Sequence, residues 1–348
     1  MNNLIVVGCW LLVVSSWLLG SKGIGQTIIR WPTRPLMTLE GDIRFTYDDN
    51  IFLYSAQDLN DFRHSVRPYR FPFTTTDDFI TTLTGILRFR TTPFPTRPLS
   101  ISIRYRQHIY AVNRIKSYQL ISLNLVQGLS KQFEFAIGYS FLPEYLIRYY
   151  KDPTVQTSPP TYIGCDFTQH LFNAELNYRI KRRLLFTPFY KYEIDDYTDK
   201  FDYYDTKANR FGFAGSYNLK SWLALNGEIE YKLAKAKGPV PDISYRQFDW
   251  LLGINLGTNP RVRISYNQEY RKFITTNLPS IDPFHSGRVD RVQNLKLDLE
   301  ISLSKVIRLV PNYELEIRKV TSPYKETIDE IKDYQNNRFG LRLNLRRF

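Results

Sequence analysis

Four histidines are the side chains with which this sequence could supply a general base near neutral pH. Enzymes that transfer acyl groups place a serine or cysteine beside a histidine, and a third group orients the ring. His64 and His285 lie in stretches without a regular pattern, and His170 shares the apolar positions of its segment. His108 alone occupies a polar position, close to Arg106, where a single histidine usually serves as a hydrogen-bonding residue. We therefore expect no catalytic residue and no enzymatic activity.

Pairs of aspartates are the groups that could hold a metal ion. Asp48 with Asp49, and Asp77 with Asp78, offer oxygen ligands suited to calcium, but neither pair lies in an ordered ligand loop. The acidic stretch 195–205 has the composition of a solvated loop. We expect turn-capping roles for these aspartates, and we expect no metal and no cofactor.

Arginines and carboxylates also recur at alternate positions over long stretches, which suits the polar lining of a channel better than a single reaction centre. If the apolar positions face lipid, the alternate positions face inward. The predicted pore-lining basic residues are Arg44, Arg88, Arg90, Arg104, Arg106, Arg338 and Arg342. The predicted pore-lining acidic residues are Glu228, Glu230, Glu269, Asp298, Glu300, Glu314 and Glu316.

Two interpretations of these charges remain open. An arginine-rich arc could face Glu228 and Glu230 across a lumen, and the resulting transverse field would orient polar solutes. Alternatively, neighbouring strands pair their charges, for example Glu314 or Glu316 with an arginine of the last strand, only to make a polar interior tolerable.

The elements that would position these residues are β-strands, because apolar and polar residues alternate with a period of two along the chain. Phe133, Phe135 and Ile137 alternate with Glu134 and Ala136, a spacing that would spread apolar groups around every side of a helix. The same pattern recurs in later segments, for example over 223–232 and 295–303.

We predict an all-β fold, a transmembrane antiparallel up-and-down barrel of about fourteen strands, with 12 to 16 possible. Short turns alternate with longer loops at 49–77, 147–166, 196–207, 274–289 and 321–334, and a proline-rich turn covers 92–98. The expected strands are 38–48, 78–90, 98–110, 117–127, 132–146, 167–180, 183–195, 208–219, 222–235, 244–256, 261–273, 290–303, 306–320 and 335–348.

Composition agrees with a folded chain rich in strands. The 348 residues include 25 Tyr and 23 Phe but only 2 Cys, and aromatic residues favour strands. The mean hydropathy of −0.35 excludes a bundle of membrane helices, but it does not exclude a barrel whose strands are half polar. The net charge of +13 comes from basic residues spread at strand spacing, so we expect no nucleic-acid partner.

The N-terminus has the pattern of an export signal. An apolar run over 4–19 is followed by the small residues Gly23 and Gly25, which suits signal-peptide cleavage before Gln26. We predict a signal peptide over 1–25, a periplasmic segment over 26–37 and an outer-membrane barrel over 38–348. Cys165 would then be the single cysteine of the mature chain, so no intramolecular disulfide could form.

Two segments resemble outer-membrane barrels of Gram-negative bacteria. The alternating segment 338–348 ends in Phe348, and this resembles the C-terminal signal that the barrel-assembly machinery recognises, although Phe348 is out of step with the apolar residues before it. The segments YDDNIF at 47–52 and DDFI at 77–80 are similar to the opening of the putative β-barrel porin type 2 family. That resemblance implies a channel or an accessory of exopolysaccharide export.

We therefore predict a porin-like channel in the cell outer membrane for passive diffusion of small hydrophilic solutes. The alternative is a non-conducting or gated barrel that acts as an accessory in exopolysaccharide export or surface assembly. In that case segment 49–77 would fold inward, and Arg67 and Arg70 would suit an acidic polysaccharide. The expected partners are outer-membrane lipid, the barrel-assembly machinery, small hydrophilic solutes and possible acidic polysaccharide.

Overall fold

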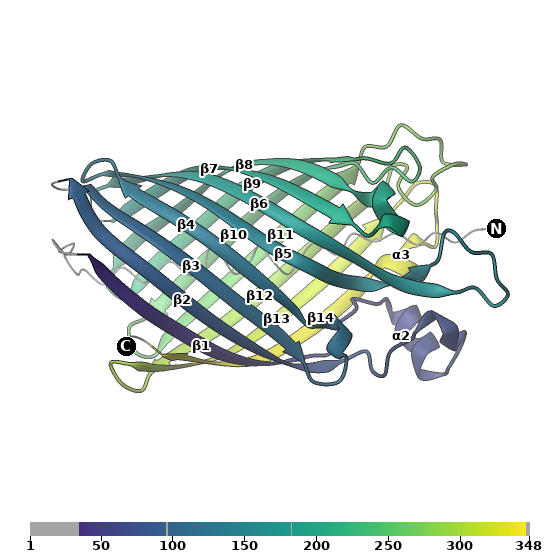
Figure 1. Ribbon diagram of the computed structural model, residues 1–348, viewed down its shortest axis with the longest axis horizontal. Coiled ribbons are helices and arrows are strands. Elements are labelled where there is room, and N and C mark those ends of the chain that lie inside the picture. The colour runs from purple at the N-terminus through teal and green to yellow at the C-terminus, as the bar shows by residue number, and fades with distance from the viewer. Residues whose placement is uncertain (1–34, 95–96, 182, 346–348) are drawn as a thin grey trace.

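The computed structural model describes residues 35–345 except 95–96 and 182, and it shows a closed β-barrel (Figure 1). The predicted signal peptide, most of the periplasmic segment and Phe348 lie outside the described residues. The strands are β1 (Leu36–Asp48), β2 (Asp78–Phe94), β3 (Arg97–Tyr110), β4 (Tyr118–Gly128), β5 (Phe133–Lys151), β6 (Tyr162–Ile180), β7 (Leu184–Tyr197), β8 (Thr206–Lys220), β9 (Leu223–Ala236), β10 (Tyr245–Gly257), β11 (Arg261–Phe273), β12 (Val289–Ser302), β13 (Ile307–Thr321) and β14 (Tyr334–Leu345).

Each strand pairs antiparallel with its neighbours in the sequence, and β1 pairs with β14 to close the ring. The closing register runs from Gly41 opposite Leu345 to Asp48 opposite Arg338. Closure leaves no strand edge without hydrogen bonds, which is the condition for strands to cross hydrocarbon. The prediction of an up-and-down barrel of about fourteen strands is confirmed.

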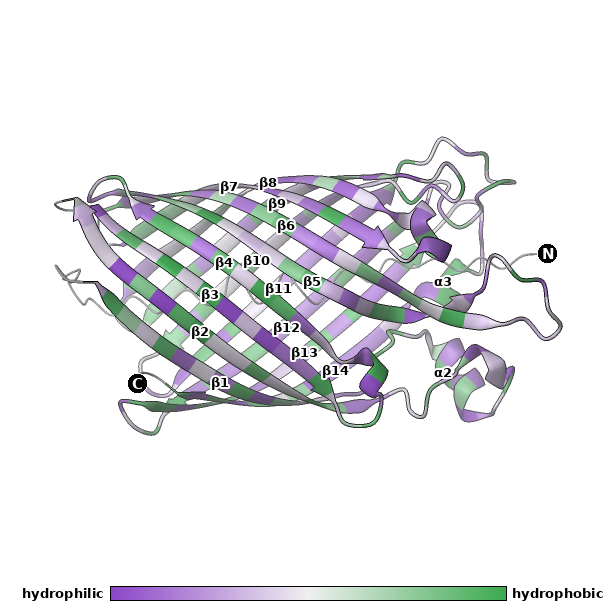
Figure 2. Ribbon diagram, viewed as in Figure 1, coloured by the Kyte–Doolittle hydropathy of each residue, from purple (hydrophilic) through white to green (hydrophobic). Residues whose placement is uncertain are grey.

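The outer surface of the barrel is apolar. Figure 2 shows hydrophobic and hydrophilic residues alternating along the strands. Large apolar side chains at alternate positions are exposed, among them Leu87 on β2, Ile103 on β3, Phe213 on β8 and Ile229 on β9. In water such a surface would drive aggregation, whereas acyl chains would cover it. No helix in the described residues is long and apolar enough to cross a membrane.

Two hairpins, β2–β3 and β5–β6, extend well beyond the predicted strand ends, and most other strand ends differ by one or two residues. The loop expected at 147–166 is shorter, because β5 and β6 continue to pair as far as Lys151 and Tyr162. The register shifts between Leu142 and Tyr145 break the alternation, so the sequence pattern ends before the strand does. Around the proline-rich turn, β2 and β3 also reach Phe94 and Arg97 across another register shift, so the turn is tighter than 92–98.

The loops gather at one end of the barrel and the short turns at the other (Figure 1). Two short helices, α2 (Ala56–Arg63) and α3 (Ile328–Lys332), lie at the loop end. The sequence analysis did not predict them, since each is too short to show a helical repeat. The side chain of Ser55 caps α2 by accepting a hydrogen bond from the backbone N–H of Asp58 at 3.1 Å.

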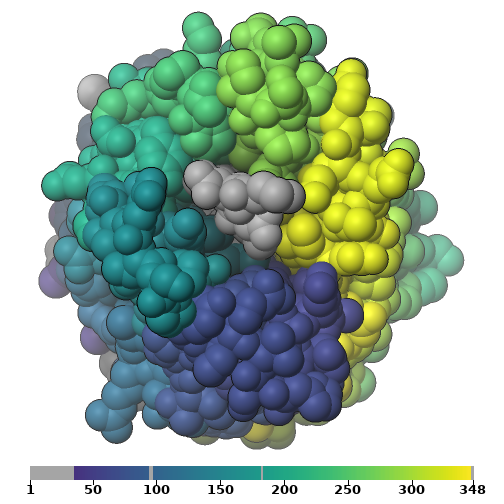
Figure 3. Space-filling view, turned by 90° about the vertical axis from the view of Figure 1, so that its right-hand side faces the viewer, coloured from purple at the N-terminus to yellow at the C-terminus, as the bar shows by residue number. Residues whose placement is uncertain are grey.

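Segment 49–77 packs against the strands at the loop end. Phe52 is fully buried and stacks on Phe73 with ring centroids 4.2 Å apart. The Lys116 ammonium lies 5.0 Å from the Phe52 ring centre and donates hydrogen bonds to the carbonyls of Leu146 and Ile147 on β5. Figure 3 looks onto this end, where the early part of the chain covers one side of the mouth. The segment is a folded part of the mouth, because its aromatic residues belong to one buried cluster with β5.

Candidate functional site: the barrel interior

All the residues predicted to line a pore lie on the inner parity of their strands. On β3, Arg104 is half-buried while its neighbours Ile103 and Tyr105 point outward and are exposed. On β9, Glu230 is buried between exposed Ile229 and Tyr231. The same alternation places the other basic and acidic candidates inward. Their contact with a solute remains a prediction.

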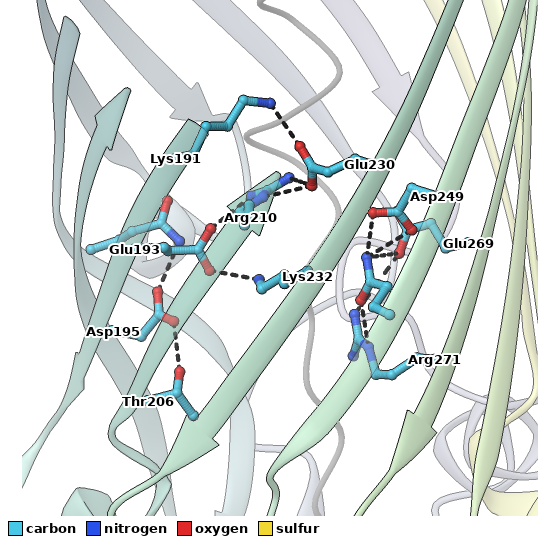
Figure 4. A network of polar contacts seen from close by, with 12 residues as sticks. Lys191, Glu193, Asp195, Thr206, Arg210, Glu230, Lys232, Asp249, Glu269 and Arg271 are labelled. Carbon is cyan, nitrogen blue, oxygen red and sulfur yellow. Dashed lines mark hydrogen bonds and ion pairs between the residues drawn. The ribbon is translucent and has the colours of Figure 1, made fainter. Parts of the chain in front are cut away.

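On one wall of the lumen, charges are paired in a group that we call the carboxylate network: Lys191, Glu193, Arg210, Glu230 and Lys232 (Figure 4). The Arg210 guanidinium donates to Glu193 at 2.7 Å and to Glu230 at 2.6 Å. Lys232 donates to the second oxygen of Glu193 at 2.7 Å, and Lys191 donates to Glu230 at 2.8 Å. Every carboxylate in the network therefore has two cationic partners.

The sequence analysis missed Lys191, Glu193 and Arg210 as interior residues. Inward positions on β7 also include Phe189, which is buried. Because Phe189 is an aromatic residue at an inward position, it interrupts the alternation of apolar and polar residues along β7. The signal was present in Lys191, Glu193 and Asp195, which alternate with Tyr190, Tyr192 and Ile194.

Charges also pair elsewhere on the inner surface. Arg338 on β14 donates to Asp48 at 2.9 Å and to Glu314 at 3.0 Å, and it lies 3.6 Å from Glu316. The predicted pairing of Glu314 and Glu316 with the last strand is thus confirmed for Arg338, although not for Arg342.

Two further predicted residues, Glu300 and Arg88, also form ion pairs. Glu300 contacts both Arg263 and Arg308, and Arg88 donates to Glu40 at 2.7 Å. These ion pairs span neighbouring strands, so they hold the wall together as well as making it polar.

The two arginines that meet where β1 and β14 close the barrel differ from the paired charges described above. We call Arg44 and Arg342, which both point into the barrel, the arginine cluster. Arg44 on β1 lies directly opposite Arg342 on β14. In each of these two side chains the Nε is buried, and it has no hydrogen-bond partner in the described part of the chain. The carboxylates that act most strongly on Arg342 are Asp298 and Asp42, and neither is within 4.0 Å of a described lysine or arginine nitrogen. Here like charges meet without direct neutralisation.

Two cavities open between the walls. The larger, about 330 Å³, reaches from β2 and β3 to β9 and is lined by Arg88 and Arg104 on one side and by Arg210 and Glu228 on the other. The second, about 300 Å³, is lined by small polar groups such as Ser216, Asn226 and Ser265. Each volume accommodates several water molecules or a small polar solute. Arg88 and Arg104 therefore share this cavity with Glu228, as the transverse-field interpretation expects, but Arg210 adds a positive charge beside that carboxylate.

The histidine and aspartate candidates have local roles. His108 stacks on Tyr118 with centroids 4.3 Å apart and lies 3.1 Å from the Thr82 hydroxyl. Asp78 accepts hydrogen bonds from the backbone N–H groups of Val112 and Asn113, so it holds the loop after β3. Among the described residues, no three histidine, cysteine or acidic side chains form a group that could hold a metal.

Two charged groups in the loops have shifted pKa values. The Lys200 ammonium donates to Asp152 at 2.6 Å, and this hydrogen bond, with those from Thr154, lowers the pKa of the Asp152 carboxyl to about 2. Burial lowers the pKa of Lys332 on α3 well below its ordinary value, and the nearby cations Arg288 and Arg148 lower it further. The loop end thus contains an ion pair between the exposed Lys200 and the buried Asp152, and a buried lysine for which the charged form is costly.

Comparisons with known proteins agree with the barrel. No family model and no curated protein matches the sequence. Among solved structures, the chain is similar to the outer membrane channel DcaP of Acinetobacter baumannii, with a TM-score of 0.50 and 12% identity over 90% of this chain and 97% of that one. It is also similar to an anion-selective porin from Comamonas acidovorans, with a TM-score of 0.45 and 11% identity over 90% of this chain and 100% of that one. The fold is that of outer-membrane channel barrels, while the resemblance to the porin type 2 family stays a prediction.

Proposed function

We propose that this protein is a porin-like channel of the outer membrane through which small hydrophilic solutes diffuse passively. The observation that carries the proposal is the cavity of about 330 Å³ that lies in the lumen along β2 to β9, lined by charged residues inside a ring with an apolar outer surface. Water and polar solutes are stable against such walls, while the outer face is stable against lipid.

The size of the ring supports conduction. Barrels of about eight strands are filled by their own side chains, and those of sixteen or more leave an aqueous channel. The strand order here places fourteen strands between these limits. A narrow path lined by fixed charges would favour polar solutes that can align with the local field.

Export by the segment 1–25, insertion by the barrel-assembly machinery through Phe348, and contact with outer-membrane lipid belong to the same proposal. The charged lining would act on solutes by its field and by hydrogen bonds, so the proposed role is transport and involves no catalytic step.

Single-channel recording in planar lipid bilayers tests the proposal. The purified barrel should first migrate differently on a gel with and without boiling, which shows that the ring is closed and folded. Such a sample should then give discrete current steps. A folded, heat-modifiable sample that never conducts would overturn the channel.

A gated barrel is the second candidate, and the packing of segment 49–77 favours it. The arginines predicted to suit an acidic polysaccharide are already paired within the segment: Arg67 with Asp61 at 2.7 Å and Arg70 with Asp58 at 2.7 Å. The structure therefore supports a role in narrowing the mouth better than a role in binding acidic sugars.

Deleting residues 57–73 tests the gate. The deletion keeps the strands intact, so a gate predicts larger current steps or longer openings than in the full-length protein. A matched control shortens the loop 153–160, which leaves segment 49–77 in place and should leave the current unchanged. Equal currents in the full-length and deleted proteins would exclude gating by this segment.

A further inference from the structure

The seam at which β1 and β14 close the barrel brings together two arginines of the same charge. Arg44 and Arg342 are directly paired in register on the inner face. Side chains at such positions have Cβ atoms about 4.5–5.5 Å apart, and like charges there destabilise the sheet. The pair is therefore costly unless something negative lies between the two guanidinium groups.

Four residues away along β14, another inward arginine is neutralised by carboxylates. Arg338 lies opposite Asp48 and is held by Asp48 and Glu314. Arg342 lies opposite Arg44 and Val310, and neither supplies a negative charge. Arg338 is thus neutralised by nearby carboxylates, although its Nη2 also lacks a hydrogen-bond acceptor in the part of the chain that the structure describes. Arg342 has no carboxylate within 4.0 Å among the described residues, and its buried Nε has no acceptor there.

More positive charge surrounds this pair. Lys296 on β12 lies close enough to Arg44 and Arg342 for their positive charges to repel its own. Arg106 on β3 is likewise within range of electrostatic repulsion from Arg342. Asp42, Asp298 and Glu314 offset part of this charge, but among the described residues none of the three forms an ion pair with Arg44 or Arg342. Cations from four strands therefore converge on one place in the lumen, and they outnumber the carboxylates beside them.

We propose that Arg44 and Arg342 form a binding site for an oxyanion, the phosphate or carboxylate group of a small solute. Two planar guanidinium groups offer parallel N–H donors that match the oxygens of such a group, and Arg106 and Lys296 add attraction. This role deepens the proposed channel function and rests on it, since the site would select the solutes that pass. A multiply charged oxyanion is bound more tightly than chloride because it accepts several charge-assisted hydrogen bonds at once.

Calorimetry on the folded barrel in detergent tests the site without requiring conduction. Inorganic phosphate and malonate are titrated separately, so that the two arms distinguish a phosphate-type from a carboxylate-type ligand. We expect saturable binding of at least one of them. In the Arg44→Gln/Arg342→Gln variant the affinity should fall by about tenfold or more, which is the loss expected for charge-assisted hydrogen bonds.

Two further variants control the result. Arg44→Lys/Arg342→Lys keeps the charge but removes the planar donors, so its affinity should lie between those of the other two proteins. The single variant Arg342→Gln serves if the double variant does not fold, as judged by heat modifiability. Binding of neither anion, or binding that is undiminished in the glutamine variants, would overturn the site. A barrel that conducts but does not bind contradicts only this inference, whereas one that binds but never conducts contradicts only the channel.

Discussion

The carboxylate network and the arginine cluster lie on different walls of one lumen. In the first, opposite charges are paired, and in the second, two like charges face each other. In the carboxylate network Arg210 sits between Glu193 and Glu230, and each carboxylate has a second cation. In the arginine cluster Arg44 faces Arg342, and no carboxylate of the described residues lies within 4.0 Å of either guanidinium group. Paired charges contribute to holding neighbouring strands, whereas unpaired like charges cost free energy and therefore point to a ligand.

The two groups also differ in how the removal of one buried charge should change the free energy of unfolding. A buried pair gains little overall, because desolvation offsets attraction, but removing one partner leaves the other uncompensated. Removing one of two like charges relieves a repulsion. Substitutions on the two walls should thus have different signs, and this comparison can be tested by measuring the free energy of unfolding.

The largest effect is expected for Arg210→Met. The change leaves Glu193 and Glu230, both almost fully buried, with only one cation each. Breaking a buried pair in this way destabilises a protein by about 3–5 kcal/mol. Urea unfolding of the barrel in detergent, followed by the gel shift on boiling, measures the loss. A loss no larger than that of an arginine-cluster variant would remove the distinction between the walls.

A smaller effect is expected for Lys191→Met, at the margin of the same network. Glu230 keeps Arg210, so only one of its two charged hydrogen bonds is lost. Loss of a hydrogen bond to a charged group costs about 1.5–3 kcal/mol. The same unfolding assay should place this variant between Arg210→Met and the wild type; any other order would contradict the hierarchy of contacts.

Near-zero loss is expected for Arg44→Gln in the absence of an oxyanion. The substitution removes one of two opposed guanidinium charges, so the unfolding free energy should stay within about 0.5 kcal/mol of the wild type or rise. Added phosphate should stabilise the wild type more than the variant, because a ligand that binds only the folded state adds to its stability. A large loss without phosphate would show that Arg44 has a structural role.

An effect confined to the loop between β5 and β6 is expected where Lys200 pairs with Asp152. The pKa of Asp152 is lowered from 3.8 to about 2, so the stabilisation is present above the ordinary pKa and is lost as pH falls through about 2. Hydrogen exchange over 149–162, compared between wild type and Asp152→Asn, should differ above pH 4 and converge at the lowest pH. A difference that persists there would exclude the ion pair as its cause.

Much of the barrel could be predicted from the sequence because period-two alternation is a direct consequence of having lipid on one face and water on the other. It identified every strand and placed residues such as Arg44 and Glu230 on the inner side. It failed at Leu142–Tyr145, where register shifts interrupt the period, and at Phe189, an aromatic residue that points inward.

Pairing between distant residues could not be predicted in the same way. The contact of Arg338 with Asp48 depends on the register at the seam, which joins residues from opposite ends of the chain. The opposition of Arg44 and Arg342 has the same origin. The packing of segment 49–77 was also hidden, since it depends on shape at the mouth and not on a repeating pattern.

The most direct test of the account is the zero-current potential of the reconstituted channel in a salt gradient, before and after Arg44→Gln/Arg342→Gln. The account predicts discrete conductance that favours anions in the wild type, and a shift of the potential towards cations in the variant, because the positive field at the narrow seam is reduced. A folded wild-type barrel that carries no current, or a potential that the double substitution leaves unchanged, would contradict it.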